Sequence, residues 1–313
     1  MSEVVTLGEC MAVLYPQEPV TLDDARTLLL DIGGAEANLS IALCRLGRSA
    51  RFISRVGDDP FGQRMRATLA AEGVDVAYLA TDTAAPTGVF FREWLPDGAR
   101  RVYYYRANSA ASRLAPEDLR AELFDGARIV HLTGITPALS ASCAAACARA
   151  IELAHAAGAL VSFDPNYRAR LWSPAAARAA LLPLMRQADI ILMGHEDAAA
   201  VLETGDDEEG SLQAAAALGA RVVVLKRAER GALALAEGAA LSVPAAPVER
   251  VVDPVGAGDG FDAGFLAGWL RGDSLEDALR LGARVGAAAV ATLGDYAGYP
   301  QLDLTKPSDK MTR

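Results

Sequence analysis

The chain has 313 residues, of which 30 are basic and 40 acidic, so its formal net charge is −10. Apolar residues make up 52% and charged residues 22%, a balance that excludes disorder for most of the chain and predicts a sizeable core. No apolar run is long enough to span a membrane, and the acidic balance argues against a nucleic-acid partner. With no secretory signal and only 4 Cys, the sequence predicts a cytoplasmic protein. Cys143 and Cys147 fit a metal or redox pair less well than two core residues on one helix face.

Short β-branched runs alternate with long stretches rich in alanine and leucine. Consecutive apolar residues, as in residues 190–193, are typical of strands buried on both faces. The alternation predicts a mostly parallel sheet with helices on both sides. The expected strands are residues 4–7, 51–56, 129–132, 160–164, 190–193 and 222–226, and the expected helices are residues 36–46, 61–72, 140–157, 174–187, 211–218, 258–270 and 275–293.

Two stretches depart from this alternation. Residues 11–32 carry no clear amphipathic helix. Residues 86–106 contain strand-like runs at 87–92 and 101–105 around Pro96-Asp97-Gly98, a hairpin signal that predicts antiparallel strands outside the main sheet. The polar residues 306–313 are expected to fray.

The sharpest local signal is residues 253–260, DPVGAGDG, directly before a predicted helix. Glycines directly before a helix leave several backbone N–H groups free to bind an anion at the positive end of the helix dipole. Asp259 at the rim could accept a proton from an attacking hydroxyl, which suits phosphoryl transfer to an alcohol. The alternative is that Asp259 merely caps the helix.

A second glycine motif, residues 33–38, GGAEAN, opens an earlier helix. Paired glycines allow a ligand to approach the backbone closely. Neither motif is a P-loop, because GxxxxGK[ST] is absent, and the turn at 256–260 is not the dinucleotide fingerprint.

With these two motifs, and with Ala263-Gly264-Phe265 after the second, the chain resembles the ribokinase-like, or PfkB, family of carbohydrate kinases. The resemblance runs from about Val4 to Pro300. It implies one domain, residues 1–313: a three-layer α/β/α sandwich with a mostly parallel central sheet and a small β-sheet lid, formed by residues 11–32 and 86–106, over the sugar. It also implies that Gly256, Ala257 and Gly258 hold the transferred phosphoryl group and that Asp259 is the catalytic base.

Two arginines near the predicted site point to an anionic substrate. Arg106 ends the second lid strand and Arg168 follows the strand 160–164, and the planar fork of arginine suits a carboxylate. The alternative is that the neighbouring tyrosines only pack and that Arg168 pairs with a carboxylate such as Asp164.

The local sequence resembles that of the 2-keto-3-deoxygluconate kinases of the family, especially at residues 104–106, 134–139 and 166–172. This resemblance implies substrate contacts from Gly34, Phe90, Tyr104, Tyr105, Arg106, Arg168, Asp259 and Asp295. Phe90 departs from the pattern, because a tyrosine is frequent at its position and a phenyl ring offers no hydroxyl.

The family resemblance also implies ATP and Mg²⁺. The ATP contacts would come from Gly194, Lys226, Arg227, Glu229, Gly231 and the turn Gly256–Gly258. Where many relatives have Asn-x-x-Glu, this chain has Gly194 and Asp197, so Asp197 is the candidate to approach the metal through water. Without the resemblance, residues 225–232 would be a solvated basic loop.

The sequence therefore predicts ATP-dependent phosphorylation of the 6-hydroxyl of 2-keto-3-deoxygluconate. The alternative within the fold is a kinase for a neutral sugar, such as a fructokinase or ribokinase. A sugar-binding regulator without catalysis and a dehydrogenase are the alternatives from other classes. Exposed edges of the lid sheet favour a homo-oligomer.

Overall fold

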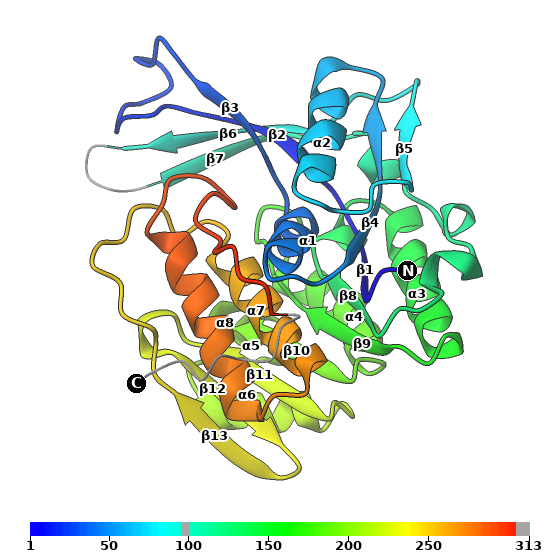
Figure 1. Cartoon of the computed structure of the whole chain (residues 1–313), viewed down its shortest axis with the longest axis vertical. Coiled ribbons are helices and arrows are strands. Elements are labelled where there is room, and N and C mark those ends of the chain that lie inside the picture. Colours follow the sequence, from blue (N-terminus) through cyan, green and yellow to red (C-terminus); the bar gives the residue numbers. More distant parts are fainter. Residues whose placement is uncertain (96–99, 305–313) are drawn as a thin grey trace.

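A computed structural model describes residues 1–95 and 100–304 of the chain (Figure 1). The hairpin turn expected at Pro96-Asp97-Gly98 and the frayed end expected at 306–313 lie outside these residues. Two sheets form the fold, one of nine strands in the order β13-β12-β11-β10-β9-β8-β1-β4-β5 and one of four in the order β3-β2-β6-β7. The predicted α/β architecture with a separate small sheet is confirmed.

The strands are β1 Val4–Leu7, β2 Met11–Tyr15, β3 Leu29–Gly33, β4 Ala50–Gly57, β5 Leu79–Asp82, β6 Val89–Trp94, β7 Arg100–Tyr105, β8 Ile129–Thr133, β9 Leu160–Asp164, β10 Ile190–Gly194, β11 Val222–Lys226, β12 Ala232–Ala236 and β13 Ala239–Val243. The α-helices are α1 Ala35–Arg45, α2 Pro60–Ala71, α3 Ala141–Ala156, α4 Pro174–Met185, α5 His195–Leu202, α6 Glu208–Ala216, α7 Ala257–Arg271 and α8 Leu275–Val290.

The nine-stranded sheet separates two hydrophobic cores. Helices α1, α2, α7 and α8 cover one face, and α3 to α6 cover the other. Along β10, Ile190 and Leu192 enter the first core while Ile191 and Met193 enter the second, which explains the unbroken apolar run. Cys143 and Cys147 are fully buried in the second core, as expected for core residues. Among the described residues, no helix combines the length and apolarity that a membrane span requires.

All the expected strands and helices of the main layers are present, with ends shifted by a few residues. The sequence analysis missed β5, β12, β13 and α5. Strand β12 pairs antiparallel with β11, and β13 pairs antiparallel with β12. Both strands are rich in alanine. Alanine has a low preference for strands, so tertiary packing rather than local propensity makes these segments extended.

The four-stranded sheet stands apart from the main sheet and is called the lid sheet below (Figure 1). The predicted hairpin is confirmed, because β6 and β7 pair antiparallel. Strands β2 and β3 come from the stretch 11–32, where no helix was expected. The edge strands expose Leu29 (38%) and Tyr105 (69%), and association with a second copy through this sheet stays a prediction.

A seam of small residues brings α7 and α8 into close contact. A Cβ on Gly264 would lie 2.8 Å from the Gly282 Cα, and one on Gly286 would lie 2.9 Å from the Ala257 carbonyl oxygen. The two helix axes can approach this closely only where no side chain intervenes. The seam therefore fixes the position of α7, whose first turn carries the DPVGAGDG glycines.

Because this seam has no spare volume, Gly264→Val should lower the free energy of unfolding by roughly 2–3 kcal/mol through overpacking. Urea denaturation followed by circular dichroism measures the change. Ala145→Val on the exposed side of α3 is the matched control, and it should cost about 0.5 kcal/mol, the difference in helix propensity. Equal losses in both variants would show that the α7–α8 contact tolerates a side chain.

Candidate active site

The two glycine motifs and the lid sheet meet at one place. The segments that converge are the start of α1, the inner face of β6 and β7, the loop after β9, the first turn of α7 and the loop after α8. The contact between α1 and α7 is direct, because the Asn38 side chain donates a hydrogen bond to Asp259 (2.8 Å). Residues that are 221 positions apart in the sequence thus share one site.

The glycine turn before α7 is tightly packed around Gly256 and open beside Gly258. Gly256 is the N-cap of α7 with φ 79°, and a Cβ there would collide with the carbonyl of Asp295. The Tyr299 hydroxyl donates to the Gly256 carbonyl (2.7 Å). A Cβ on Gly258, by contrast, would find only the Lys226 Nζ, 3.8 Å away. The N–H groups of Gly258 and Asp259 lie in the first helical turn, where no intrahelical acceptor exists, so they can bind an anion.

Asp259 is half-buried at the third position of α7. It is not the helix cap, because Gly256 holds that position. Burial raises the pKa of Asp259, whereas the hydrogen bond from Asn38 and the positive charge of Arg168 act to lower it. A carboxylate whose proton affinity is raised in this way, beside an anion-binding turn, can act as a general base.

Three of the predicted substrate contacts come together at the start of α1: Gly34 of the glycine pair, and Phe90 and Asp295 beside Gly33. A Cβ on Gly34 would collide with the Glu9 carbonyl, and one on Gly33 would collide with the Asp295 carboxylate. The same Cβ on Gly33 would lie 3.2 Å from the Phe90 ring. The two glycines therefore let the lid sheet, α1 and the Asp295 loop come together. Burial raises the pKa of Asp295 to about 7.

The inner face of the lid sheet carries Phe90 and Tyr104, whose ring centroids lie 5.7 Å apart. The Arg106 guanidinium lies 5.4 Å from the centre of the Tyr104 ring and forms an ion pair with the buried Glu9. Tyr105 lies on the opposite face, where its ring packs edge-on against Phe91. The structure thus brings Tyr104 and Arg106 to the site but not the ring of Tyr105.

Arg168 is exposed on the loop after β9, near enough to Asp259 for its charge to be felt there. Its guanidinium donates a hydrogen bond to the Tyr167 carbonyl (3.1 Å). The alternative pairing of Arg168 with Asp164 is not what the structure contains, because Asp164 pairs with Lys226 instead. Arg168 therefore presents its positive charge to the solvent side of the site.

Lys226 lies at the centre of a buried ionic cluster. Its Nζ lies 2.9 Å from Asp164 and 3.0 Å from Asp262, a residue that the sequence analysis did not single out. Burial alone would raise the pKa of Asp164, but Lys226 holds it below its ordinary value. Burial raises the pKa of Asp262 well above its ordinary value. The lysine ammonium lies 3.8 Å from the Cβ position of Gly258, so this cluster supports the turn electrostatically.

The other residues predicted on the nucleotide side have diverse surroundings. Both oxygens of Asp197 accept backbone N–H groups, from Gly194 (2.6 Å) and from Tyr167 (2.6 Å). Burial and the nearby Asp164 raise the pKa of Asp197 to about 6. Arg227 is held by Glu208 and by Ser242, so its guanidinium is already engaged. Glu229 is exposed, and Gly231 (φ 84°) makes the turn into β12.

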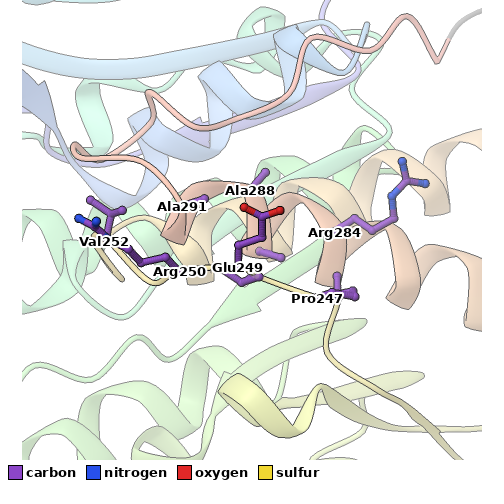
Figure 2. A pocket seen from close by; sticks show the side chains of 10 residues that line it. Pro247, Glu249, Arg250, Val252, Arg284, Ala288 and Ala291 are labelled. Carbon is purple, nitrogen blue, oxygen red and sulfur yellow. The ribbon is translucent and has the colours of Figure 1, made fainter.

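A cavity of about 650 Å³ opens between the loop after β13 and α8 (Figure 2). Pro247, Arg250 and Val252 line it from the loop, and Ala288 and Ala291 line it from α8. The alanines leave a shallow apolar wall. Gly286 of the same helix, which does not line the cavity, lies against the Ala257 carbonyl at the start of α7. The sequence analysis missed this cavity because its residues form no motif.

Comparison with known proteins identifies this arrangement. A family model described as "pfkB family carbohydrate kinase" matches residues 1–302. The chain belongs to the pfkB family of carbohydrate kinases. The predicted family is confirmed, and with it the prediction of an ATP-binding carbohydrate kinase.

Relatives of differing specificity stand at similar distances. A 2-dehydro-3-deoxygalactonokinase from Haloferax volcanii is 35% identical over 83% of this chain and 82% of its own. A 2-dehydro-3-deoxygluconokinase from Thermoproteus tenax is 36% identical over 83% of this chain and 79% of its own. Fructokinase-1 from Zea mays is 34% identical over 82% of this chain and 80% of its own. These identities establish the family, but they are too similar to one another to indicate which sugar this chain phosphorylates.

Solved structures agree with the fold. A PfkB protein from a Polaromonas species superposes with a TM-score of 0.86 at 36% identity, covering 95% of this chain and 98% of its own. A putative ribokinase II from E. coli in complex with ATP and Mg²⁺ superposes with a TM-score of 0.87 at 26% identity, covering 96% of each chain.

Replacing Lys226 with Met should lower the free energy of unfolding by roughly 3–5 kcal/mol at pH 7, because Asp164 and Asp262 would be left buried without a cation. The loss should shrink as the pH falls, since Asp262, whose pKa is already raised, takes up a proton first and Asp164 loses its charge by about its ordinary pKa of 3.8 once Lys226 is gone. Denaturant unfolding at several pH values measures this trend. Arg271→Met, which breaks the partly exposed pair with Asp273, is the control and should cost no more than about 1 kcal/mol. A pH-independent loss for Lys226→Met would contradict the electrostatic account.

Proposed function

We propose that this protein transfers the terminal phosphoryl group of ATP to the 6-hydroxyl of 2-keto-3-deoxygluconate. The observation that carries the proposal is the position of Arg168, an exposed guanidinium whose charge reaches Asp259 across the mouth of the site. An arginine placed there can hold a carboxylate at one end of a substrate while the base takes a proton from a hydroxyl at the other.

The chemistry follows from the turn before α7. Asp259 removes the proton of the attacking hydroxyl as the new P–O bond forms. The N–H groups of Gly258 and Asp259 stabilise the charge on the oxygens of the transferred phosphoryl group. The lid sheet, with Phe90 and Tyr104 facing inward, excludes water and so favours transfer to the sugar over hydrolysis.

The residues of the nucleotide side fit ATP and Mg²⁺. Gly258 leaves room above the turn for a phosphate, and the cavity beside α8 has an apolar wall that suits a flat base. No cluster of three or more His, Cys, Asp or Glu side chains in the described residues could hold a metal by itself. Mg²⁺ would therefore be held by the ATP phosphates and, through water, by Asp197, and when bound it neutralises phosphate charge.

Arg106 has a different role from Arg168. Its charge is balanced by Glu9, although burial raises the pKa of Glu9. The ion pair with Glu9 does not use the buried Nε–H of Arg106, which has no hydrogen-bond acceptor among the described residues. This N–H can donate to a substrate oxygen, so Arg106 orients the sugar while Arg168 supplies the net positive charge that a carboxylate needs.

A fructokinase-type activity on a neutral sugar is the second candidate. The observation that favours it is the same Glu9–Arg106 pair, which leaves the inner part of the site without net positive charge. The two candidates differ in one respect, since only the sugar acid requires Arg168.

The test is an ADP-release assay with ATP and Mg²⁺ and with 2-keto-3-deoxygluconate, its galacto epimer, fructose or ribose. We expect turnover with the keto acid, roughly 100-fold or more loss of kcat for Asp259→Asn, and a KM for the keto acid that rises roughly tenfold or more for Arg168→Ala. Arg186→Ala, at the end of the distant helix α4, is the matched arginine control. Turnover on fructose or ribose with Arg168→Ala unchanged would refute the sugar-acid assignment.

The pH dependence tests the role of Asn38. Because its hydrogen bond acts to lower the pKa of Asp259, Asn38→Ala should move the acid limb of the kcat/KM profile to higher pH. Activity at high pH should be largely retained, since the carboxylate is ionised there in both proteins. Ser40→Ala, in the same helix but bonded to the Glu36 carbonyl, is the control and should leave the profile in place. An acid limb that stays or moves to lower pH in Asn38→Ala would contradict this assignment.

A further inference from the structure

Arg92 is a buried arginine in the lid sheet that the proposed reaction does not use. It lies on β6 two residues after Phe90 and is 6% exposed. The alternation along the strand places Phe90 and Arg92 on the inner face. Glu93 between Arg92 and Trp94 is on the other face, where it accepts a hydrogen bond from Tyr103.

The Arg92 guanidinium extends from the lid sheet to two carboxylates in the loops before α7 and after α8. Its Nη1 lies 2.9 Å from Asp253 Oδ2, and its Nη2 lies 3.2 Å from Asp295 Oδ1. The side chain also stacks over the Tyr15 ring of β2, 4.5 Å from its centre. The planar fork of arginine is suited to such a bridge, since its two N–H edges can bind different carboxylates.

Both carboxylates belong to the segments that shape the phosphate-binding turn. Asp253 is the first residue of DPVGAGDG, and its Oδ1 accepts the Val255 N–H (3.3 Å). Its Oδ2 accepts the Gly294 N–H (3.2 Å) and so joins the turn to the loop after α8. The Asp295 carbonyl from that loop occupies the space beside Gly256 that a side chain would fill. A shift of either carboxylate would therefore shift the N–H groups of the turn.

We propose that Arg92 is a positioning residue that makes the geometry of the phosphate-binding turn depend on the seating of the lid sheet. The inference rests on the proposed function for its consequence, that sugar and nucleotide bind cooperatively. When the lid sheet is seated, the guanidinium holds Asp253 and Asp295 together and the turn is formed. When the sheet lifts, the two ion pairs break and the turn relaxes. Coupling of this kind is reciprocal, so nucleotide in turn favours the seated lid.

Repulsion between the two carboxylates, Asp253 and Asp295, makes the geometry of the turn depend strongly on Arg92. Without the guanidinium, Asp253 and Asp295 would be buried side by side, and like charges repel steeply where water is excluded. Burial already raises the pKa of Asp295 to about 7, and Asp253 adds to that rise. An ammonium from lysine would compensate one charge but could not bridge both carboxylates in the same plane.

The first measurement needs no substrate. Native-state hydrogen exchange of Arg92→Met should show roughly tenfold or faster exchange in residues 253–260, since the loss of a buried charge pair releases the turn. Arg92→Lys should fall between Arg92→Met and the wild type. Arg101→Met, an exposed arginine on the neighbouring strand β7, is the matched control and should exchange as the wild type does. Equal acceleration across all helices of Arg92→Met would indicate a general loss of stability and would overturn the proposal.

The second measurement is the affinity for a fluorescent ATP analogue with and without 2-keto-3-deoxygluconate. In the wild type and in Arg101→Met the sugar acid should tighten nucleotide binding several-fold, and in Arg92→Met the gain should disappear. A gain that persists in Arg92→Met overturns the proposal. If the keto acid has no effect and no turnover in the wild type, the proposed substrate is wrong, while the exchange rates of residues 253–260 still decide the role of Arg92.

Discussion

The first turn of α7 is held in place by contacts that leave no room for side chains. The Asp295 carbonyl fills the space beside Gly256, and the Ala257 carbonyl lies against Gly286 of α8. Farther along, Gly264 meets Gly282 across the helix pair. Backbone packed directly on backbone can move only if a whole helix or loop moves. The N–H groups of Gly258 and Asp259 are therefore preorganised as long as the Asp295 loop stays in place, and catalysis by charge stabilisation depends on such fixed donors.

Around this turn the buried charges are arranged in groups, each with one cation. Lys226 compensates Asp164 and Asp262, Arg92 compensates Asp253 and Asp295, and Arg106 compensates Glu9. The first two groups each contain two carboxylates and one cation. Burial raises the pKa of Asp262 and of Asp295, and the neighbouring carboxylate in each group adds to the rise. A polyanionic nucleotide entering such surroundings would be repelled without a divalent cation. This charge balance supports the proposal that ATP binds together with Mg²⁺, although no residue cluster in the described part of the chain encloses a metal by itself.

The sequence predicted the parts of the fold that obey local rules. The buried parallel strands were visible as apolar runs, the start of α4 as Ser173-Pro174, and the glycine turn as a motif. Strands β12 and β13 were missed because their alanines do not favour a strand locally, and these segments become extended by pairing, β12 with β11 and β13 with β12. The alternation along β7 predicts that Tyr104 and Tyr105 lie on opposite faces. Which of them faces the site had to come from the structure, where Tyr104 packs with Phe90 on the inner face. The roles of Arg92 and Asp262 depend on partners far away in the chain, which a single sequence does not reveal.

The distribution of arginines bears on the proposed sugar-acid substrate. A substrate carboxylate near Asp259 and Asp295 would meet negative charge unless a cation without a carboxylate partner lay close by. Arg92 and Arg106 are engaged with buried carboxylates, whereas Arg168 contacts only a carbonyl among the hydrogen bonds of the described residues. Its charge acts to lower the pKa of Asp259, against the burial that raises it. In the proposed reaction, a bound carboxylate would neutralise Arg168, weaken this lowering and so raise the proton affinity of Asp259 as the hydroxyl comes within reach. Recognition of the carboxylate would then be coupled to the chemistry at the other end of the substrate.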